Sequence, residues 1–426
     1  MPLSRRELLV RGSALAGGAA LLGLPEWARP AAAQSAPRLP APASSGIDHI
    51  VVVMMENRSF DHFLGWLPGA DGHQAGLSFT DQAGVEHSTY RLAEFQGCGH
   101  ADPDHSWEGG RTEYANGACD GWLRAGDNDE FAIGYYTAPD LAFYGHAAPY
   151  WTVCDRYFAA IMAETYPNRM YLHAAQTDRL HNGEGPTIAT LPTIWDSLQA
   201  AGRTGRYYFS DAPYTALWGT KYLPISEPIA GFFADAAAGT LPDVSYVDPR
   251  FLDEGSGSSG DDHPHADIRI GQHFLSSLYQ AVTTGPKWAN TMFVITYDEW
   301  GGFFDHVPPP VASDANPKAR LRGFRVPCIV VSPRARRKYV AHNLYDHTSI
   351  LKLIEWRFGL KPLTVRDAEA RNLAEVLDFR SAPNLAAPQW NVPPALPAPC
   401  VNGAPGDYEG WKALADQALA TGWSLV

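Results

Sequence analysis

Two runs of apolar, β-branched residues, Ile50–Met55 and Thr291–Tyr297, are each followed at once by a carboxylate and a second oxygen-bearing side chain. Such runs are typical of strands buried on both faces of a parallel sheet. Ligands of these sheets gather beyond the carboxyl ends of the strands, and oxygen ligands suit a divalent cation. Side chains that only cap turns are the alternative. The pattern predicts a metal site made of Glu56, Asn57, Asp298 and Glu299.

A nucleophile candidate lies between these two runs. Thr165 precedes Pro167, a residue that suits the first turn of a helix, and a helical pattern continues over residues 170–176. We therefore expect Thr165 just outside a helix N-terminus, where free N–H groups bind phosphate. A Thr hydroxyl there attacks phosphorus once a metal ion has lowered its pKa. The alternative is an ordinary helix cap, which is a common role for Thr.

Histidines next to acidic residues supply candidates for proton transfer. His105, His263 and His306 each have an acid beside them or two residues away, and the same is true of His265 and His347. An acid that reaches the imidazole orients the ring and raises its basicity. A structural hydrogen bond is the alternative for each of them. We predict His105, His263 and His306 as catalytic residues and leave the roles of His265 and His347 open.

The charges of the predicted metal site point to a further requirement. Three carboxylates and one divalent ion leave about one negative charge, and a phosphate ester adds more. Phosphoryl transfer depends on positioning and charge neutralisation. The site therefore needs protonated histidines, Arg169 or a second cation.

The elements that must position these residues alternate along the chain. Three further strands are expected, at Gly205–Phe209, Val244–Val247 and Val326–Val331, and helices at 193–201, 268–283, 349–358 and 408–419. Alternation of this kind predicts an α/β fold with a central, mostly parallel sheet flanked by helices.

The N-terminal residues have the pattern of an export signal. Arg5 and Arg6 precede a mildly apolar run at 14–24 and a small-residue cleavage site at 31–33. This pattern predicts a twin-arginine signal peptide over residues 1–33 and a periplasmic, cell-wall or extracellular location. A linker at 34–46, a catalytic domain at 47–380 and a C-terminal extension at 381–426 packed on that domain complete the predicted organisation.

Composition excludes some partners and permits disulfides. The formal net charge of −13 argues against nucleic acid, because a duplex binder needs a basic face. No internal stretch is apolar for the length of a membrane span. Export allows disulfides among the five cysteines. We expect Cys98–Cys119, because both residues lie in one loop-rich stretch.

Four motifs carry a family resemblance: residues 56–62 (ENRSFDH), 165–168 (TYPN), 261–264 (DDHP) and 298–309 (DEWGGFFDHVPP). Over residues 47–360 the chain resembles the bacterial and plant phosphatidylcholine-type phospholipase C and acid phosphatase family. The resemblance implies an alkaline-phosphatase-like fold, with Glu56, Asn57, Asp298 and Glu299 as metal ligands and Thr165 as nucleophile. It also implies that His105 and His263 bind the phosphoryl group or act as acid and base, and His306 matches the last motif.

The resulting hypothesis is a secreted phospholipase C that cleaves the glycerol-side phosphodiester of glycerophospholipids through a phospho-Thr intermediate. Thr165 favours this hypothesis, because acid phosphatase members of the family tend to carry Ser at this position. An acid phosphatase acting on phosphomonoesters and a non-catalytic secreted binding protein are the alternatives. The expected partners are a divalent metal ion, a phospholipid or small phosphate ester, and transiently a membrane surface. The aromatic stretch 131–151 lines a lipid or choline pocket or, alternatively, is core packing.

Overall fold

The computed structural model describes residues 38–396, 399–400 and 408–425. The predicted signal peptide and the first residues of the predicted linker lie outside the described residues. From residue 38 onward these residues belong to one compact unit. None of the helices in the described ranges is long and apolar enough to cross a membrane.

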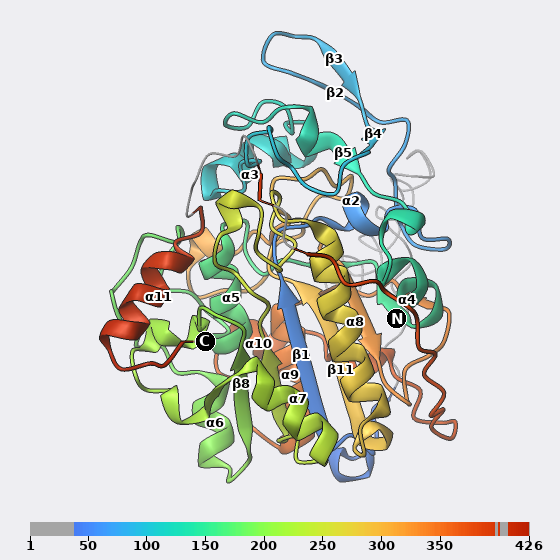
Figure 1. Cartoon of the computed structure of the whole chain (residues 1–426), viewed down its shortest axis with the longest axis vertical. Helices are drawn as coiled ribbons and strands as arrows, with labels where there is room; N and C mark the ends of the chain where they lie inside the picture. The colour runs from blue at the N-terminus through green and yellow to red at the C-terminus, as the bar shows by residue number, and fades with distance from the viewer. Residues whose placement is uncertain (1–37, 397–398, 401–407, 426) are drawn as a thin grey trace, which may run out of the picture. The chain divides into compact units, whose positions relative to one another are not determined.

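A central eight-stranded sheet organises the molecule, in the order β13-β6-β12-β11-β1-β10-β8-β9 (Figure 1). Strand β1 pairs in parallel with β10 and β11, and the pairs β10–β8, β8–β9 and β13–β6 are also parallel. Strand β12 is antiparallel to both of its neighbours. The predicted mostly parallel sheet is therefore confirmed. The strands are β1 His49–Met55, β6 Thr152–Cys154, β8 Gly205–Phe209, β9 Ser226–Pro228, β10 Val244–Val247, β11 Thr291–Tyr297, β12 Cys328–Val331 and β13 Tyr339–Ala341.

The register of β1 and β11 decides where the two predicted acidic pairs lie. His49 is opposite Thr291, and Met55 is opposite Tyr297 at the other end. The two strands end level, so the residues that follow them leave the sheet at the same edge.

One predicted strand begins later than expected. The apolar run at 326–331 forms β12 only from Cys328 onward. Pro327 has no N–H to give to the sheet, so it suits the position just before the strand. The apolar run carries no information on direction, and β12 is in fact antiparallel to β11.

Helices flank the sheet, as predicted. In Figure 1, α7 and α8 lie in front of the sheet and α9 lies behind it. The predicted helices correspond to α6, α8, α9 and α11. The bounds are α2 Phe60–Leu64, α3 Trp107–Tyr114, α4 Tyr144–Tyr150, α5 Thr165–Ala174, α6 Ile194–Ala200, α7 Ile229–Ala238, α8 Ile268–Thr284, α9 His347–Phe358, α10 Val365–Glu369 and α11 Trp411–Ala420.

Short two-stranded sheets lie outside the main sheet. Strand β14 pairs with β7, β2 with β3, and β4 with β5. Their bounds are β2 Ser78–Thr80, β3 Glu86–Ser88, β4 Tyr90–Arg91, β5 Gly134–Tyr135, β7 Tyr157–Phe158 and β14 Tyr345–Asp346.

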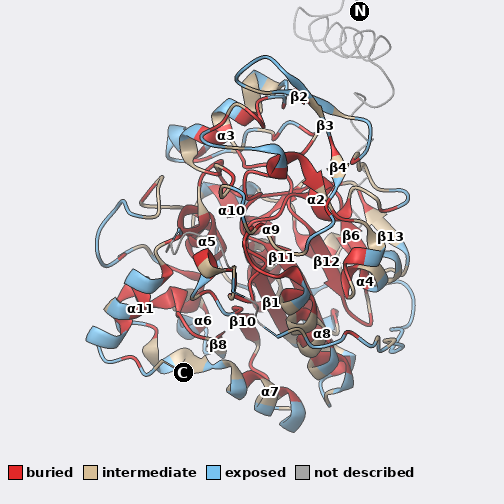
Figure 2. Ribbon diagram, turned by 45° about the horizontal axis from the view of Figure 1, so that its top comes forward, coloured by how far each residue is buried: buried red, intermediate tan, exposed pale blue. Residues whose placement is uncertain are grey.

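The aromatic stretch at 131–151 belongs to the core. Phe131, Tyr136, Phe143, Tyr144 and Trp151 are all buried. Figure 2 shows in red that the central strands β1 and β11 are buried as well. The aromatic rings pack against neighbouring rings in edge-to-face contacts, as aromatic residues in cores commonly do. The packing alternative is therefore correct for these residues, and they do not offer a lipid pocket.

The described part of the C-terminal extension packs on the domain, as Figure 1 shows in red. The Tyr279 hydroxyl donates to the Pro388 carbonyl at 2.9 Å, and Trp390 stacks on the Tyr279 ring. Trp411 opens α11 with its indole buried.

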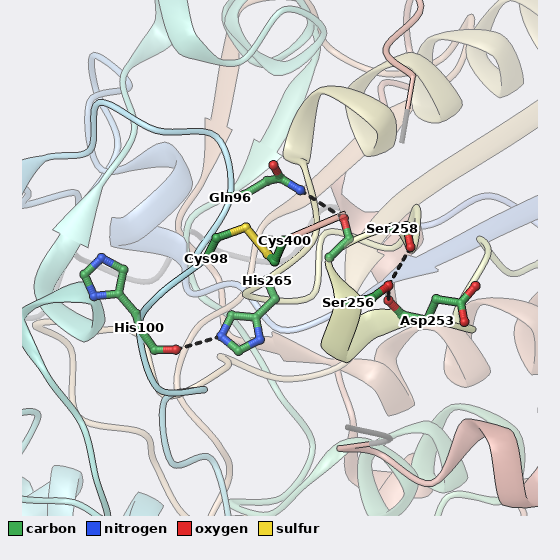
Figure 3. The surroundings of a disulfide bond; sticks show 9 residues. Gln96, Cys98, His100, Asp253, Ser256, Ser258, His265 and Cys400 are labelled. Atoms are coloured by element: carbon green, nitrogen blue, oxygen red, sulfur yellow. Dashed lines mark hydrogen bonds between the residues drawn. A yellow bond between two sulfur atoms is a disulfide. The ribbon is translucent and has the colours of Figure 1, made fainter. Parts of the chain in front are cut away.

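The disulfide differs from the predicted Cys98–Cys119 pair. Cys98 is bonded to Cys400, 302 residues further along the chain, while Cys119 is a buried free thiol (Figure 3). Cys119 follows α3 and packs with Trp122, so its side chain is held in an apolar cluster. Proximity in the sequence was misleading, because the C-terminal extension returns to the loop that carries Cys98.

Candidate active site

The two acidic pairs meet around one buried arginine. Arg169, on α5, lies 3.1 Å from Glu56 Oε1, from Asp298 Oδ2 and from Asp248 Oδ1. All four side chains are buried. Arg169 therefore supplies part of the positive charge that the sequence requires at this edge of the sheet.

Thr165 lies against the same group of residues. It is the first residue of α5 rather than the residue before the helix, a shift of one position from the prediction. Its hydroxyl donates to Asn57 Oδ1 at 3.3 Å, and the Asn57 backbone N–H donates to Asp298 Oδ1 at 3.3 Å. The hydroxyl is thus directed at a predicted metal ligand and not at the helix backbone.

The backbone at this edge is shaped by a close approach. Asn57 has a φ of 62°, in the left-handed region that Asn tolerates better than most residues. Gly301 has a φ of +65°, and a Cβ there would lie 2.2 Å from the Asn57 carbonyl oxygen. Only glycine fits this contact, which explains the first glycine of the motif at 298–309.

Glu299 completes the strand-borne half of the site. Its Oε2 accepts a hydrogen bond from the Gly301 N–H at 2.7 Å. Its Oε1 is buried without a hydrogen-bond partner among the described residues. Burial and the nearby Asp298 carboxylate hold the pKa of Glu299 well above its usual range. Such an oxygen is suited to a cation, because an unpaired buried acceptor is costly.

Two of the predicted catalytic histidines form the other half. The His105 Nδ1–H donates to the Pro103 carbonyl at 2.7 Å, so Nε2 faces the site. The rings of His105 and His263 are 6.2 Å apart, centroid to centroid.

Burial alone would lower the pKa of His263, but Asp102 and Glu409 outweigh it and raise the pKa to about 10. The pKa of His105 is likewise held well above its usual range, by Glu299 and Glu409 against burial. The two shifts favour the protonated form of each ring.

Glu409 is the site residue that sequence reasoning missed. It lies between the two halves, with Oε1 at 2.6 Å from His105 Nε2 and at 3.7 Å from His263 Nε2. Asn57 Nδ2 donates to the same oxygen at 3.5 Å, and Asn182 Nδ2 donates to the other one. Glu409 comes from the C-terminal extension and belongs to none of the four motifs, so no pattern in the sequence indicated it.

The third predicted catalytic histidine lies in a different cluster. His306 Nδ1 donates to Asp61 Oδ2 at 2.5 Å, and Arg325 bridges Asp61 and Asp305. Burial lowers the pKa of His306, but Asp61 outweighs it and raises the pKa to about 9. The catalytic role of His306 stays a prediction, and its contacts are those of an ion-pair network.

The two histidines left open have structural partners. The His347 Nε2–H donates to the Asp298 carbonyl at 2.6 Å, so His347 supports the strand end from α9. His265 Nε2 lies 3.1 Å from the His100 carbonyl, beside the disulfide (Figure 3).

A further group of carboxylates adjoins Glu56. Oxygen atoms of Glu56, Glu254 and Asp261 lie within 4.8 Å of one another. Glu254 Oε2 and Asp261 Oδ2 are buried without hydrogen-bond partners in the described ranges. Burial raises the pKa of Glu56 well above its usual range even though Arg169 opposes the shift. Among the described residues, the density of buried negative charge fits a cation at this edge of the sheet.

The entrance to the site is acidic. A pocket of about 560 Å³ opens beside His105 and Glu409. Its wall includes four more carboxylate-bearing residues: Asp102, Asp104, Asp127 and Glu164. An anionic ligand approaching through this entrance is repelled, while a group with a positive charge is attracted.

Comparison with known proteins identifies the family of the chain. The model of the Phosphoesterase family matches residues 47–361. The chain belongs to this Phosphoesterase family, and the predicted membership in a phosphoesterase family is confirmed.

Relatives extend over most of the chain. Phospholipase C A of Mycobacterium tuberculosis is 30% identical, over 96% of this chain and 92% of the relative. Non-specific phospholipase C1 of Arabidopsis thaliana is 30% identical, over 80% of this chain and 73% of the relative. Non-hemolytic phospholipase C of Pseudomonas aeruginosa is 29% identical, over 86% of this chain and 62% of the relative.

Solved structures are more distant. A protein of the alkaline phosphatase superfamily from Vibrio parahaemolyticus has a TM-score of 0.41 at 9% sequence identity. The match covers 79% of this chain and 71% of the Vibrio chain. A lipoteichoic acid synthase from Listeria monocytogenes has the same TM-score, 0.41, at 8% sequence identity. The match covers 91% of this chain and 94% of the Listeria chain.

Proposed function

We propose that the protein is an exported phospholipase C that hydrolyses the glycerol-side phosphodiester of glycerophospholipids. The observation that carries the proposal is the position of Thr165. Its hydroxyl lies at the N-terminus of α5 and donates to Asn57 Oδ1, while Asn57 Nδ2 donates to Glu409, which lies 2.6 Å from His105 Nε2. Relatives named phospholipase C, aligned over most of the chain, support the same reaction class.

The reaction proceeds in two steps on these residues. Thr165 Oγ1 gives its proton to solvent water and bonds to phosphorus, while the bond between phosphorus and the glycerol oxygen breaks. His263, protonated at neutral pH, gives a proton to that oxygen, and diacylglycerol leaves. Water then attacks phosphorus, and His263, neutral after the first step, accepts its proton. The bond between phosphorus and Thr165 Oγ1 breaks, the headgroup phosphate leaves, and Oγ1 takes a proton from solvent.

A divalent ion is part of the proposal. Glu56, Asn57, Asp298 and Glu299 would hold it, and the partnerless Glu299 Oε1 supports this assignment. When bound, the ion neutralises phosphate charge and lowers the pKa of the Thr165 hydroxyl. Arg169, between Glu56 and Asp298, keeps the two carboxylates fixed relative to each other.

The acidic entrance favours a diester over a phosphomonoester. Asp102, Asp104, Asp127 and Glu164 repel a dianionic monoester, whereas the positive end of a zwitterionic headgroup is attracted to them. This electrostatic preference is why we favour phospholipase C over an acid phosphatase. Contact with a membrane surface is then transient, during extraction of the lipid.

The proposed location follows from the N-terminal pattern. Arg5 and Arg6 with the small-residue site at 31–33 support twin-arginine export, and the disulfide between Cys98 and Cys400 suits an oxidising compartment.

A lipid assay tests the proposed reaction. The purified mature chain, supplied with divalent cations, is incubated with phosphatidylcholine vesicles and, separately, with 4-nitrophenyl phosphate. We expect diacylglycerol release to exceed phosphomonoester hydrolysis by at least about tenfold in kcat/KM, equivalent to about 1.4 kcal/mol in transition-state binding. Fast hydrolysis of the monoester without diacylglycerol release would show an acid phosphatase instead. Inactivity toward both substrates would support a binding protein.

A further inference from the structure

The C-terminal segment Tyr408–Trp411, called the strap below, enters the candidate active site. Its second residue, Glu409, is 1% exposed although it lies near the end of the chain. The Glu409 N–H donates to Glu254 Oε1 at 2.7 Å, and the Tyr166 hydroxyl donates to the Gly410 carbonyl at 3.1 Å. The backbone of the strap is therefore bonded to residues on both sides of the site.

Aromatic contacts fix both ends of the strap. The Trp411 indole stacks on Phe251, with ring centroids 3.9 Å apart and planes 3° from parallel, and its N–H donates to Glu56 Oε2 at 3.2 Å. The Tyr408 ring is stacked on His263 at 5.8 Å. The Cys98–Cys400 disulfide anchors the chain upstream, next to the loop that leads to His105 (Figure 3).

The carboxylate of Glu409 lies among side chains that are suited to bind an anionic ligand. Oε1 lies 2.6 Å from His105 Nε2 and accepts a hydrogen bond from Asn57 Nδ2, and Oε2 accepts one from Asn182 Nδ2. His263 Nε2 lies 3.7 Å from Oε1. Charged and amide donors of this kind also bind phosphate oxygens. Asn57 links this carboxylate to the nucleophile, because its Oδ1 accepts from Thr165 at 3.3 Å.

The strap also divides the surface beside the site. Tyr408, Glu409 and Asn182 line the acidic pocket next to His105. The same three residues line a second pocket of about 430 Å³, whose lining also includes Leu217 and Leu414. The strap therefore lines two neighbouring pockets.

We propose that the strap is a built-in competitor of the substrate: Glu409 holds the phosphoryl position, and a phosphodiester binds only when it displaces this carboxylate. The proposal rests on the proposed function, because it assumes that His105 and His263 bind phosphate. An internal ligand reduces the apparent affinity of an external one by the fraction of molecules in which the position is open.

Binding of inorganic phosphate to the full mature chain tests the proposal without any turnover. We compare wild type, Glu409→Gln and Glu409→Ala by titration calorimetry. The matched control is Asp416→Asn, which removes one exposed carboxylate from α11, the helix that begins at the end of the strap. Loss of the competing charge should tighten phosphate binding about tenfold in both Glu409 variants and leave the control at the wild-type value.

The same variants are assayed with bis(4-nitrophenyl) phosphate. In the two Glu409 variants, KM should fall together with the dissociation constant of phosphate. If Glu409 were catalytic, kcat would fall and KM would stay unchanged, and this result would overturn the proposal. Phosphate binding that is equal in all four proteins would overturn it as well, and would leave the proposed function intact. Phosphate binding in none of them would overturn both.

Hydrogen exchange gives a readout that does not depend on substitution. The Glu409 amide, bonded to Glu254, should exchange faster in wild type when saturating inorganic phosphate is added, because the strap is displaced. Unchanged or slower exchange of this amide with phosphate bound would contradict displacement.

Discussion

Two buried arginines, Arg169 and Arg325, each sit among carboxylates, yet the two clusters differ in how completely their oxygens are paired. Around Arg325, both oxygens of Asp61 and both oxygens of Asp305 accept hydrogen bonds. Around Arg169, both oxygens of Asp248 and Asp298 are also paired, and Glu56 Oε1 lies 3.1 Å from the guanidinium. One oxygen each of the adjoining Glu254, Asp261 and Glu299, however, has no hydrogen bond in the part of the chain that the structure describes.

This difference in hydrogen bonding distinguishes a cluster that stabilises the fold from one that can bind a ligand. A fully paired network is a stable link between segments, here between α2, the loop after β11 and the segment before β12. A partly paired one keeps charge available for a ligand, at a cost in stability. The two clusters therefore predict opposite consequences for the same chemical change.

Asp298→Asn breaks the cluster at Arg169 and should have the largest effect. We expect kcat/KM for bis(4-nitrophenyl) phosphate to fall at least about thousandfold, because a predicted metal ligand and partner of Arg169 is lost. The free energy of unfolding should change by less than about 1.5 kcal/mol, since relief of repulsion among acids offsets the lost ion pair. Retention of activity within tenfold would remove Asp298 from the site.

Asp305→Asn makes the same change in the cluster at Arg325. The free energy of unfolding should fall by about 3 kcal/mol, because the buried Arg325 guanidinium loses a carboxylate at 2.9 Å. Activity of the folded protein should stay within about threefold of wild type. Denaturant titration and initial rates measure the two quantities, and a large loss of kcat at unchanged stability would mean that this cluster also serves catalysis.

A pH series on His306→Gln should show a smaller effect. The pKa of His306 is about 9 in the folded protein and about 6.5 when the chain is unfolded, so the protonated ring stabilises the fold. This contribution is complete below pH ~6.5 and is lost as the pH rises through ~9. The difference in unfolding free energy between wild type and variant should therefore shrink from pH 6 to pH 9. A difference that is independent of pH would contradict the His306–Asp61 pairing.

The strand-borne half of the site could be predicted from sequence because its cause is local. Continuous apolar runs identify β1 and β11, and the first residues after them, Glu56 and Asp298, must lie at the sheet edge. Thr165 could be placed to within one residue for a similar reason, since Pro167 indicates a helix start.

The rest of the site depends on contacts between distant segments. Glu409 and Cys400 reach the site only because the C-terminal extension folds back, and no short pattern records that return. His306 shares a motif with Asp298 but turns toward Arg325, whose position is set by the three-dimensional fold. The direction of β12 could not be read from a run of apolar residues either.

The most direct test of the account is an acid quench of the enzyme during turnover of phosphatidylcholine, followed by mass analysis of the peptide that contains Thr165. We predict a headgroup phosphate attached to Thr165 in the wild type, and in Thr165→Ala neither the adduct nor detectable turnover. An adduct on another residue, or turnover that survives in Thr165→Ala, would contradict the assignment of Thr165 as the nucleophile.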